Sequence, residues 1–292
     1  MKDEEGRSAE ADGEVPHGVL AAVLTPMRDD LEVDQPAFSA HCHRLLESGC
    51  HGLGVFGTTG EANSLSVQER LDALDALVAD GVPAAALLPG VGACALPDAV
   101  RLSRRALELG VGGTLALPPF YYKEVSDDGL FRFFAELIER VADDRLRLFL
   151  YHVPPVAHVG FSISLIERLV GAYPGVIAGT KESGGDVDRI EQLCNQFPQL
   201  AIFAGTERFL LDTLRWGGAG CISATCNVTS GLAREVYDLH AAGRESEADD
   251  KQAQLTAVRA ELEAQPLIPT LKGLLAEAGG NDAWRNLRPP LV

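Results

Sequence analysis

One unit of the chain, residues 147–181, reads RLFLYHVPPVAHVGFSISLIERLVGAYPGVIAGTK. It begins with an apolar run at Arg147–Tyr151 and ends with a second run at Val176–Gly179. Between them, Leu165–Ala172 has apolar residues at the spacing of an amphipathic helix. Neither run alternates with polar residues, which indicates strands buried on both faces, as in a parallel sheet covered by helices. The stretch therefore predicts a strand, a helix and a second strand parallel to the first.

The same unit recurs along the chain. Apolar runs stand at Gly18–Thr25, Gly52–Phe56, Ala84–Leu88, Gly113–Leu117, Arg147–Tyr151, Val176–Gly179, Leu200–Ala204 and Gly220–Ala224. Segments of helical period stand at Phe38–Leu46, Val67–Val78, Ala99–Leu109, Leu130–Val141, Leu165–Ala172, Val187–Phe197, Phe209–Trp216 and Leu232–Ala242. Because no linker divides the chain, we expect a single (β/α)8 barrel over residues 17–292, with additional C-terminal helices at 245–263 and 269–278. An open, Rossmann-like sheet is the alternative.

Composition and charge exclude several classes of protein. The 292 residues carry 42 Asp and Glu against 25 Lys and Arg, a formal net charge of −17. Nucleic-acid-binding proteins present a basic face, so we expect no nucleic-acid partner. No apolar segment approaches the roughly 18–20 residues of a membrane span, and the acidic start lacks the apolar core of a signal peptide. We therefore expect a cytoplasmic protein with no membrane partner. Residues 1–16 are expected to form a disordered acidic tail before the barrel.

Cysteine and histidine spacing indicates neither disulfides nor a metal site. The six cysteines are scattered and form no Cys-x-x-Cys pair, so we expect reduced thiols that pack as small apolar residues. His41 and His43 are two residues apart, and on a helix such side chains diverge by about 200°. We therefore expect no bound metal.

The active site of a (β/α)8 barrel lies at the C-terminal ends of its strands. The strings that end the apolar runs include GTTGE at 57–61, PPFYY at 118–122, YHVPP at 151–155 and GTKES at 179–183. Lys181 ends a buried strand and points into the barrel mouth, where burial disfavours the ammonium form. Such an amine can attack a ketone and form a Schiff base. The alternative is a lysine paired with Glu182 at the barrel rim.

Two neighbouring strings carry groups that suit this chemistry. Tyr151 ends the preceding strand and can transfer protons, although a strand-end tyrosine can also be a packed ring with a solvated hydroxyl. Thr58 and Thr59 lie in a turn flanked by glycines, whose N–H and hydroxyl groups can hold a carboxylate. The alternative for this pair is ordinary turn chemistry.

The strings GTTGE, YHVPP and GTKESGG, in this order and spacing, resemble those of the dihydrodipicolinate synthase / N-acetylneuraminate lyase family of class I aldolases. The resemblance extends from about Gly18 to Pro290. It implies a (β/α)8 barrel, usually a homotetramer built as a dimer of dimers. It also implies a covalent imine with pyruvate or another 2-oxo acid, formed without a separate cofactor.

The resemblance assigns roles to individual residues. It implies that Lys181 forms the imine and that Tyr151 transfers protons above it. Thr58 and Thr59 correspond to the pair beside the pyruvate carboxylate, with Thr59 linked into the tyrosine relay.

Two further positions take roles from the same resemblance. Tyr122 corresponds to a tyrosine that many members insert into the site of a neighbouring subunit. Ile222 corresponds to the strand-eight position whose backbone carbonyl faces the substrate.

Departures from the family pattern bear on the substrate. Lysine-pathway synthases usually read Tyr-Asn-Val-Pro-x-Arg, where the arginine holds the carboxylate of the aldehyde. Here His152 stands at the asparagine position and Val156 at the arginine position. His152 either tunes the tyrosine relay or is a buried, hydrogen-bonded histidine. Arg208 either supplies the missing cation or is a surface residue paired with Glu207.

These features favour a lyase or aldolase that acts on a sugar acid or hydroxy-2-oxo acid. One alternative is the 4-hydroxy-tetrahydrodipicolinate synthase of lysine biosynthesis. A second is a dehydratase that acts on 2-oxo-3-deoxy acids through the same imine. A third, outside the enzymes, is a regulatory protein that binds 2-oxo acids without turnover.

Overall fold

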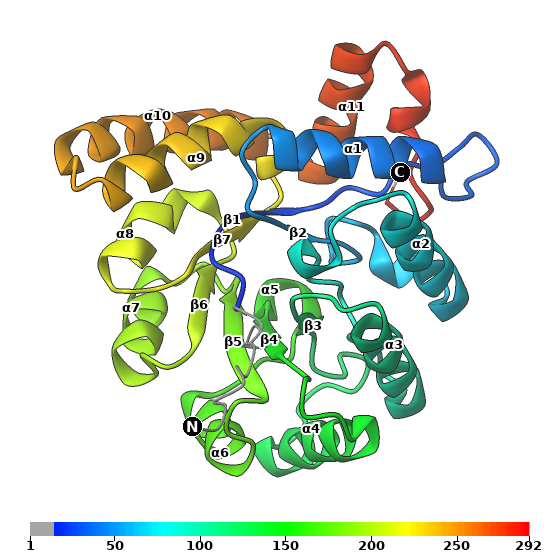
Figure 1. Ribbon diagram of the computed structural model, residues 1–292, viewed down its shortest axis with the longest axis vertical. Helices are drawn as coiled ribbons and strands as arrows, with labels where there is room; N and C mark the ends of the chain where they lie inside the picture. The colour runs from blue at the N-terminus through cyan, green and yellow to red at the C-terminus, as the bar shows by residue number, and fades with distance from the viewer. Residues whose placement is uncertain (1–14, 292) are drawn as a thin grey trace, which may run out of the picture.

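Parallel strands form the centre of the protein, whose computed structural model describes residues 15–291 (Figure 1). One seven-stranded sheet has the order β2-β1-β7-β6-β5-β4-β3. The strands are β1 (Gly18–Ala22), β2 (Gly52–Gly54), β3 (Thr114–Ala116), β4 (Leu148–His152), β5 (Ile177–Glu182), β6 (Ala201–Ala204) and β7 (Gly220–Ser223). Helices surround the sheet on its outer side (Figure 1).

The segment between β2 and β3 closes the sheet into a barrel. Leu87 forms a parallel bridge with Leu53 of β2, and Gly90 forms one with Leu115 of β3. The N–H of Val91 donates to the carbonyl of Leu115 at 2.8 Å. The expected (β/α)8 barrel is therefore confirmed, and the open-sheet alternative is excluded.

The third apolar run does not form the strand expected at Ala84–Leu88. Ala84–Ala86 is a 3-10 helix, η2, in which the N–H of Ala86 donates to the carbonyl of Pro83 at 3.0 Å. Alanine has a low strand propensity, and Pro89 has no N–H to give to a ladder. The bounds of this strand were wrong, and the residues from Leu87 to Gly90 take its place in the barrel.

Each expected helix is present, some with different ends. The helices are α1 (Gln35–Glu47), α2 (Val67–Ala79), α3 (Leu96–Glu108), α4 (Asp127–Val141), α5 (Pro154–Ala157), α6 (Ile163–Ala172), α7 (Val187–Gln196), α8 (Leu210–Arg215), α9 (Cys226–Ala241), α10 (Glu245–Glu263) and α11 (Leu267–Gly279). Three more short 3-10 helices are η1 (Ala62–Ser64), η3 (Glu207–Phe209) and η4 (Asp282–Arg285). The one-turn helix α5 was not expected, and α9 begins at Cys226 rather than Leu232.

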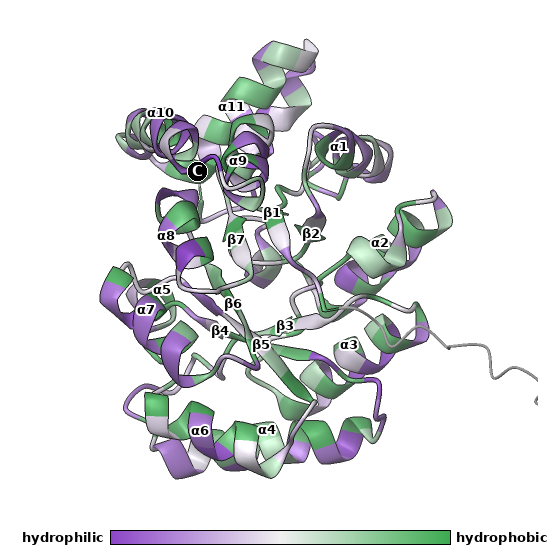
Figure 2. Cartoon of the chain, turned by 60° about the vertical axis from the view of Figure 1, so that its left-hand side comes forward, coloured by the Kyte–Doolittle hydropathy of each residue, from purple (hydrophilic) through white to green (hydrophobic). Residues whose placement is uncertain are grey.

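Side chains of the strands pack in two layers. Those that point inward, such as Leu20, Phe149 and Ile222, fill the barrel in one buried cluster. Those that point outward, such as Leu53 and Leu148, join a larger cluster with the helices. The helices themselves carry both hydrophobic and hydrophilic residues (Figure 2). The alternation of inward and outward side chains along each strand decides which strand-end residues face the barrel mouth.

The expected acidic tail, residues 1–16, lies mostly outside the described residues. Its last two residues, Val15 and Pro16, are half-buried, and Val15 packs against the cluster inside the barrel. No helix within residues 15–291 is long and apolar enough to cross a membrane.

The cysteines are free thiols, five of them buried and Cys94 exposed. His41 is buried with Nε2 2.8 Å from Oδ1 of Asn227, whereas His43 contacts the carbonyl of Asp80. The two imidazoles diverge as expected. Among the described residues, no group of three or more His, Cys, Asp or Glu is arranged to hold a metal ion.

We expect Gly90→Ala to destabilise the barrel at its closing segment. A Cβ atom at Gly90 would lie 2.1 Å from the carbonyl oxygen of Phe56, and such overpacking costs about 1–3 kcal/mol of the free energy of unfolding. The midpoint of urea unfolding measures this loss. The control is Gly171→Ala on α6, where an added Cβ atom would meet no atom of another element within 4 Å and alanine stabilises a helix by about 0.5–1 kcal/mol. An unchanged midpoint for Gly90→Ala would contradict the role of Gly90 in closure.

Candidate active site

Lys181 and Tyr151 lie side by side inside the barrel. β4 and β5 pair in parallel with Tyr151 opposite Lys181, so both side chains point to the same face of the sheet. Tyr151 belongs to the inward cluster, and Nζ of Lys181 lies 4.3 Å from the centroid of the Tyr151 ring. The two residues are only 4% and 5% exposed. The sequence-predicted amine and hydroxyl therefore share one enclosed space.

Glu182 points away from Lys181 and takes another partner. Its Oε2 accepts a hydrogen bond from Nε of Arg189 at 2.7 Å, and its Oε1 accepts one from the N–H of Gly184 at 2.6 Å. Burial raises the pKa of the Glu182 carboxyl, although Arg189 opposes this shift. The alternative in which Lys181 pairs with Glu182 is wrong, because adjacent residues of a strand face opposite sides of the sheet.

The turn after β2 reaches the hydroxyl of Tyr151. Oγ1 of Thr58 lies 3.3 Å from this hydroxyl, whereas the contact was expected from Thr59. The two threonines are consecutive in a tight turn, which the N–H of Glu61 closes on the carbonyl of Thr58 at 3.1 Å. Their side chains therefore leave the turn in different directions, and the residue in contact with the tyrosine is Thr58.

Ile222 and Tyr122 occupy contrasting places. Ile222 lies on β7, fully buried in the inward cluster together with Tyr151. Tyr122 follows β3 and is 72% exposed, with its ring 5.4 Å from that of the exposed Tyr121. The structure thus places Ile222 in the barrel with Lys181 and leaves Tyr122 on the surface of its own chain.

His152 lies on the outer side of β4. It pairs in register with Glu182, and its Nδ1 accepts a hydrogen bond from the N–H of Phe161 at 2.9 Å. Burial, with a further contribution from Arg189, lowers the pKa of this imidazole to about 4. Of the two interpretations, the structure supports the buried, hydrogen-bonded histidine, which holds the loop before α6.

The remaining specificity candidates do not meet at the barrel mouth. Glu207 is buried and accepts a hydrogen bond from Nη1 of Arg259 on α10 at 2.6 Å, while Arg208 bonds Glu263 at 2.6 Å on the surface. The expected Glu207–Arg208 pair is wrong, because α10 supplies the buried carboxylate with its cation. Val156 lies on α5 and is 58% exposed.

Two residues with unusual surroundings were missed from the sequence. Oγ of Ser183 is buried without a hydrogen-bond partner among the described residues. Its position two residues after Lys181 was the available signal, since such residues share a face of an extended segment. Lys272 on α11 is fully buried and donates to Glu61. Its signal was a single charge within the apolar stretch LIPTLKGLL at 267–275.

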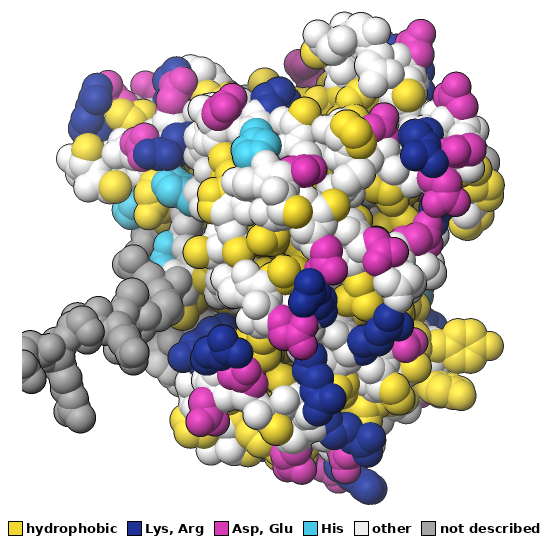
Figure 3. Space-filling model, turned by 45° about the vertical axis from the view of Figure 1, so that its right-hand side comes forward, with side chains coloured by type: hydrophobic (Ala, Val, Ile, Leu, Met, Phe, Trp, Pro, Cys, Tyr) yellow, Lys and Arg dark blue, Asp and Glu magenta, His cyan; other side chains and the backbone are white. Residues whose placement is uncertain are grey.

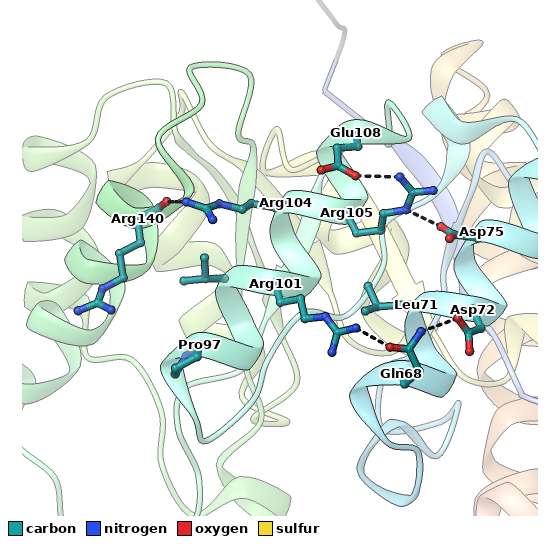
Figure 4. Close-up of a pocket in the computed structure, with 11 residues that line it drawn as sticks. Gln68, Leu71, Asp72, Asp75, Pro97, Arg101, Arg104, Arg105, Glu108 and Arg140 are labelled. Atoms are coloured by element: carbon teal, nitrogen blue, oxygen red, sulfur yellow. Dashed lines mark hydrogen bonds and ion pairs between the residues drawn. The ribbon is translucent and has the colours of Figure 1, made fainter.

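A cavity of about 750 Å³ lies outside the barrel, between α2, α3 and α4 (Figure 4). Figure 3 shows a band of Lys and Arg side chains on this face of the molecule. Arg105 bridges Asp75 at 2.7 Å and Glu108 at 2.8 Å, and Arg104 donates to the carbonyl of Arg140. These arginines tie neighbouring helices together, so the cavity is not the candidate for the chemistry of Lys181.

Comparison with known proteins agrees with this geometry. The sequence model of the Dihydrodipicolinate synthetase family matches residues 15–292. An uncharacterised DapA-like lyase of Chloroflexus aurantiacus is 35% identical over 261 residues, which cover 89% of this chain and 86% of the relative.

Solved structures give the same result. The crystal structure of dihydrodipicolinate synthase from Agrobacterium tumefaciens has a TM-score of 0.85 and 34% identity, and the match covers 94% of this chain and 93% of that chain. A structure of CdNal from Clostridium difficile in complex with mannosamine has a TM-score of 0.85 and 26% identity over the same shares. Members of the family form a lysine Schiff base without a separate cofactor. A family match that spans every described residue, together with relatives above 30% identity, shows that the chain belongs to the Dihydrodipicolinate synthetase family and is a lyase of the class I aldolase type.

Proposed function

We propose that Lys181 forms an imine with pyruvate or a longer 2-oxo acid, and that the protein makes or breaks the adjacent carbon–carbon bond. The observation that carries this proposal is the enclosed pair of Lys181 and Tyr151, with Nζ 4.3 Å from the ring centroid. A protonated imine withdraws electrons from the neighbouring bond, which is the role of covalent catalysis by lysine. We further propose that Tyr151 and Thr58 transfer the protons.

In the cleavage direction, the amine of Lys181 adds to the ketone carbon and water leaves. The hydroxyl on the fourth carbon then loses a proton, and the bond between the third and fourth carbons breaks. Its electron pair moves toward the imine and forms an enamine, while an aldehyde leaves. Protonation of the third carbon and hydrolysis release pyruvate and free Lys181. The hydroxyl of Tyr151, 3.3 Å from Oγ1 of Thr58, lies where it can exchange these protons.

The turn of Thr58 and Thr59 is the proposed holder of the substrate carboxylate. Within residues 15–291, neither backbone N–H donates a hydrogen bond to another protein group. Two such donors in one turn form a concavity that binds anions. The N–H donors of Thr58 and Thr59 are needed because the chain has a formal net charge of −17. The overall field of this charge repels an anionic substrate.

For the second substrate we propose a hydroxylated 2-oxo acid, or the sugar aldehyde it releases. Oγ of Ser183 is buried and lacks a hydrogen-bond partner among the described residues, and buried hydroxyls normally have one. A Cβ atom at Gly205 would lie 1.9 Å from this oxygen, so glycine leaves it room. A substrate hydroxyl bound at Ser183 would complete its hydrogen bonding.

The synthase of lysine biosynthesis is the second candidate, because relatives bear that name. Its incoming aldehyde carries a carboxylate, and the cation expected to bind it is replaced here by Val156. Arg208, the possible substitute, is engaged with Glu263 on the surface. These contacts favour a hydroxylated substrate over aspartate semialdehyde.

We also propose that the protein is a homotetramer in which Tyr122 enters the site of a neighbouring subunit and takes part in proton transfer there. The exposed pair of Tyr121 and Tyr122 supports this assembly, because large exposed aromatic residues are typical of protein interfaces.

Reduction with borohydride in the presence of pyruvate is expected to add one reduced pyruvyl group to Lys181. Peptide mass mapping locates the label. Lys181→Ala should remain unlabelled, whereas Lys251→Ala, which removes a surface lysine paired with Glu235, should be labelled like the parent. Absence of label from the parent, or label at another lysine, would disprove the proposed imine.

A substrate panel tests the choice of second substrate. Pyruvate release is measured with 2-oxo-3-deoxy sugar acids, 4-hydroxy-2-oxoglutarate and sialic acid, and condensation is measured with aspartate semialdehyde. We expect the highest kcat/KM with a hydroxylated acid, and a loss of about tenfold in Ser183→Ala, the effect of one hydrogen bond. Ser164→Ala, on the exposed start of α6, is the matched control. Fastest turnover with aspartate semialdehyde would favour the synthase, and a dehydratase would keep every carbon in one product.

The role of Tyr122 is separable from that of its neighbour. We expect a tetramer by analytical ultracentrifugation and, in Tyr122→Phe, an unchanged mass with kcat lowered about a hundredfold, the lower range for a lost proton-transfer group. Tyr121→Phe is the matched control and should keep the parental kcat. Equal kcat values in the two variants, or a fully active monomer, would contradict this proposal.

A further inference from the structure

A buried ion pair joins the C-terminal part of the chain to the turn after β2. Lys272 lies on α11 and Glu61 ends the GTTGE string, and the two residues are 0% and 2% exposed. Nζ of Lys272 donates to Oε1 of Glu61 and to the carbonyl of Asn286, the latter at 2.8 Å. Burial lowers the pKa of Lys272 although Glu61 opposes this shift. A buried ion pair of this kind needs well-placed partners to persist.

Glu61 has a backbone conformation that requires support. Its φ is +56°, in the left-handed region, which is unfavourable for residues other than glycine. Both carboxylate oxygens are held, Oε1 by Lys272 and Oε2 by the N–H of Arg288 at 3.0 Å. The N–H of Glu61 in turn closes the turn on the carbonyl of Thr58 at 3.1 Å. The conformation of the turn is therefore fixed from its last residue.

The side chain of Arg288 makes further hydrogen bonds to backbone carbonyls near the turn. Its Nη1 donates to the carbonyl of Ser64 at 2.7 Å and its Nε donates to that of Leu31 at 2.9 Å. Lys272 and Arg288 thus hold Glu61 and Ser64, which follow Thr58 and Thr59 in the chain.

A second buried cation in the C-terminal helices offers a comparison. Arg259 on α10 binds Glu207 at 2.6 Å and the hydroxyls of Ser223 and Thr225 at 2.7 Å each. It joins α10 to the loops after β6 and β7 and makes no hydrogen bond to the turn of residues 57–61 within the described chain. Its removal should disturb stability as the removal of Lys272 does, without touching that turn.

We propose that Lys272 is a positioning residue that, through Glu61, sets the turn of Thr58 and Thr59 for a substrate carboxylate. The C-terminal helix α11 thereby contributes to the selectivity of the site for 2-oxo acids over uncharged carbonyl compounds. This inference rests on the proposed role of the turn in binding the carboxylate.

The test compares imine formation by two carbonyl compounds. Pyruvate carries a carboxylate, whereas propanal carries a carbonyl group and none. The amount of reduced adduct on Lys181 after borohydride treatment is measured against the concentration of each compound. The proteins are the full-length parent, Lys272→Met and Arg259→Met. A fourth protein, Glu61→Gln/Lys272→Met, removes both charges and leaves no unpaired buried ion, so it covers the case in which Lys272→Met does not fold.

The half-saturating concentration of pyruvate is expected to rise about tenfold or more in both Lys272 variants, because a misplaced turn loses charge-assisted hydrogen bonds. It should change less than about twofold in Arg259→Met, and the concentration for propanal should stay constant in all four proteins. Thermal unfolding is recorded in parallel to show that the variants are folded.

Three results would overturn the inference. The first is a pyruvate shift in Arg259→Met equal to that in Lys272→Met, and the second is an equal shift for pyruvate and propanal in the Lys272 variants. The third is an unshifted double variant. A parent protein that pyruvate does not label would instead overturn the proposed function, and with it this inference.

Discussion

The parallel register between β4 and β5 is the constraint on which the site depends. It sets Tyr151 opposite Lys181 inside the barrel and His152 opposite Glu182 outside it. If the pairing shifted by one residue, the side chains that now face the inside of the barrel would face the outside. The carboxylate of Glu182 would then lie where the amine of Lys181 lies now. The outer contacts of Glu182 with Arg189 and of His152 with the N–H of Phe161 oppose such a slip. Residues on the outside of the sheet thus keep the amine on the inside.

The buried carboxylates are neutralised by cations. Three carboxylates are buried in the described chain, and each has a cation, since Glu182 binds Arg189, Glu207 binds Arg259 and Glu61 binds Lys272. No carboxylate pairs with Lys181 within residues 15–291. Because each buried carboxylate already has a cation, none of them engages the amine of Lys181.

The sequence could predict what depends on local pattern. The barrel, the strand ends and the inward direction of Lys181 and Tyr151 follow from apolar runs, helical period and alternation. The strand at Ala84–Leu88 had wrong bounds because apolar runs of alanine do not distinguish a strand from a helical turn. α9 begins earlier than expected because Asn227 anchors its first turn to the carbonyl of Ala22 at 2.8 Å, a contact between residues far apart in the chain.

Errors in the site have the same origin. The contact of Thr58 with Tyr151, and the partners of Glu207 and Arg208, are set by the path of a turn and by the approach of α10. Ion pairs of this kind join residues separated by tens or hundreds of positions, and no local period encodes them. The exposure of Tyr122, whose ring contacts that of the equally exposed Tyr121, is likewise not encoded in a local period.

The contact of Lys272 on α11 with Glu61 also affects the order in which parts of the protein can fold during synthesis. Lys181, Tyr151 and both threonines leave the ribosome within the first 181 residues. The anchors of the turn, Lys272 and the N–H of Arg288, are 211 and 227 positions beyond Glu61. Chains fold while they grow from the N-terminus, so a nascent chain can assemble its barrel before it can fix its binding turn. The turn is fixed by residues that are synthesised more than 200 positions after it.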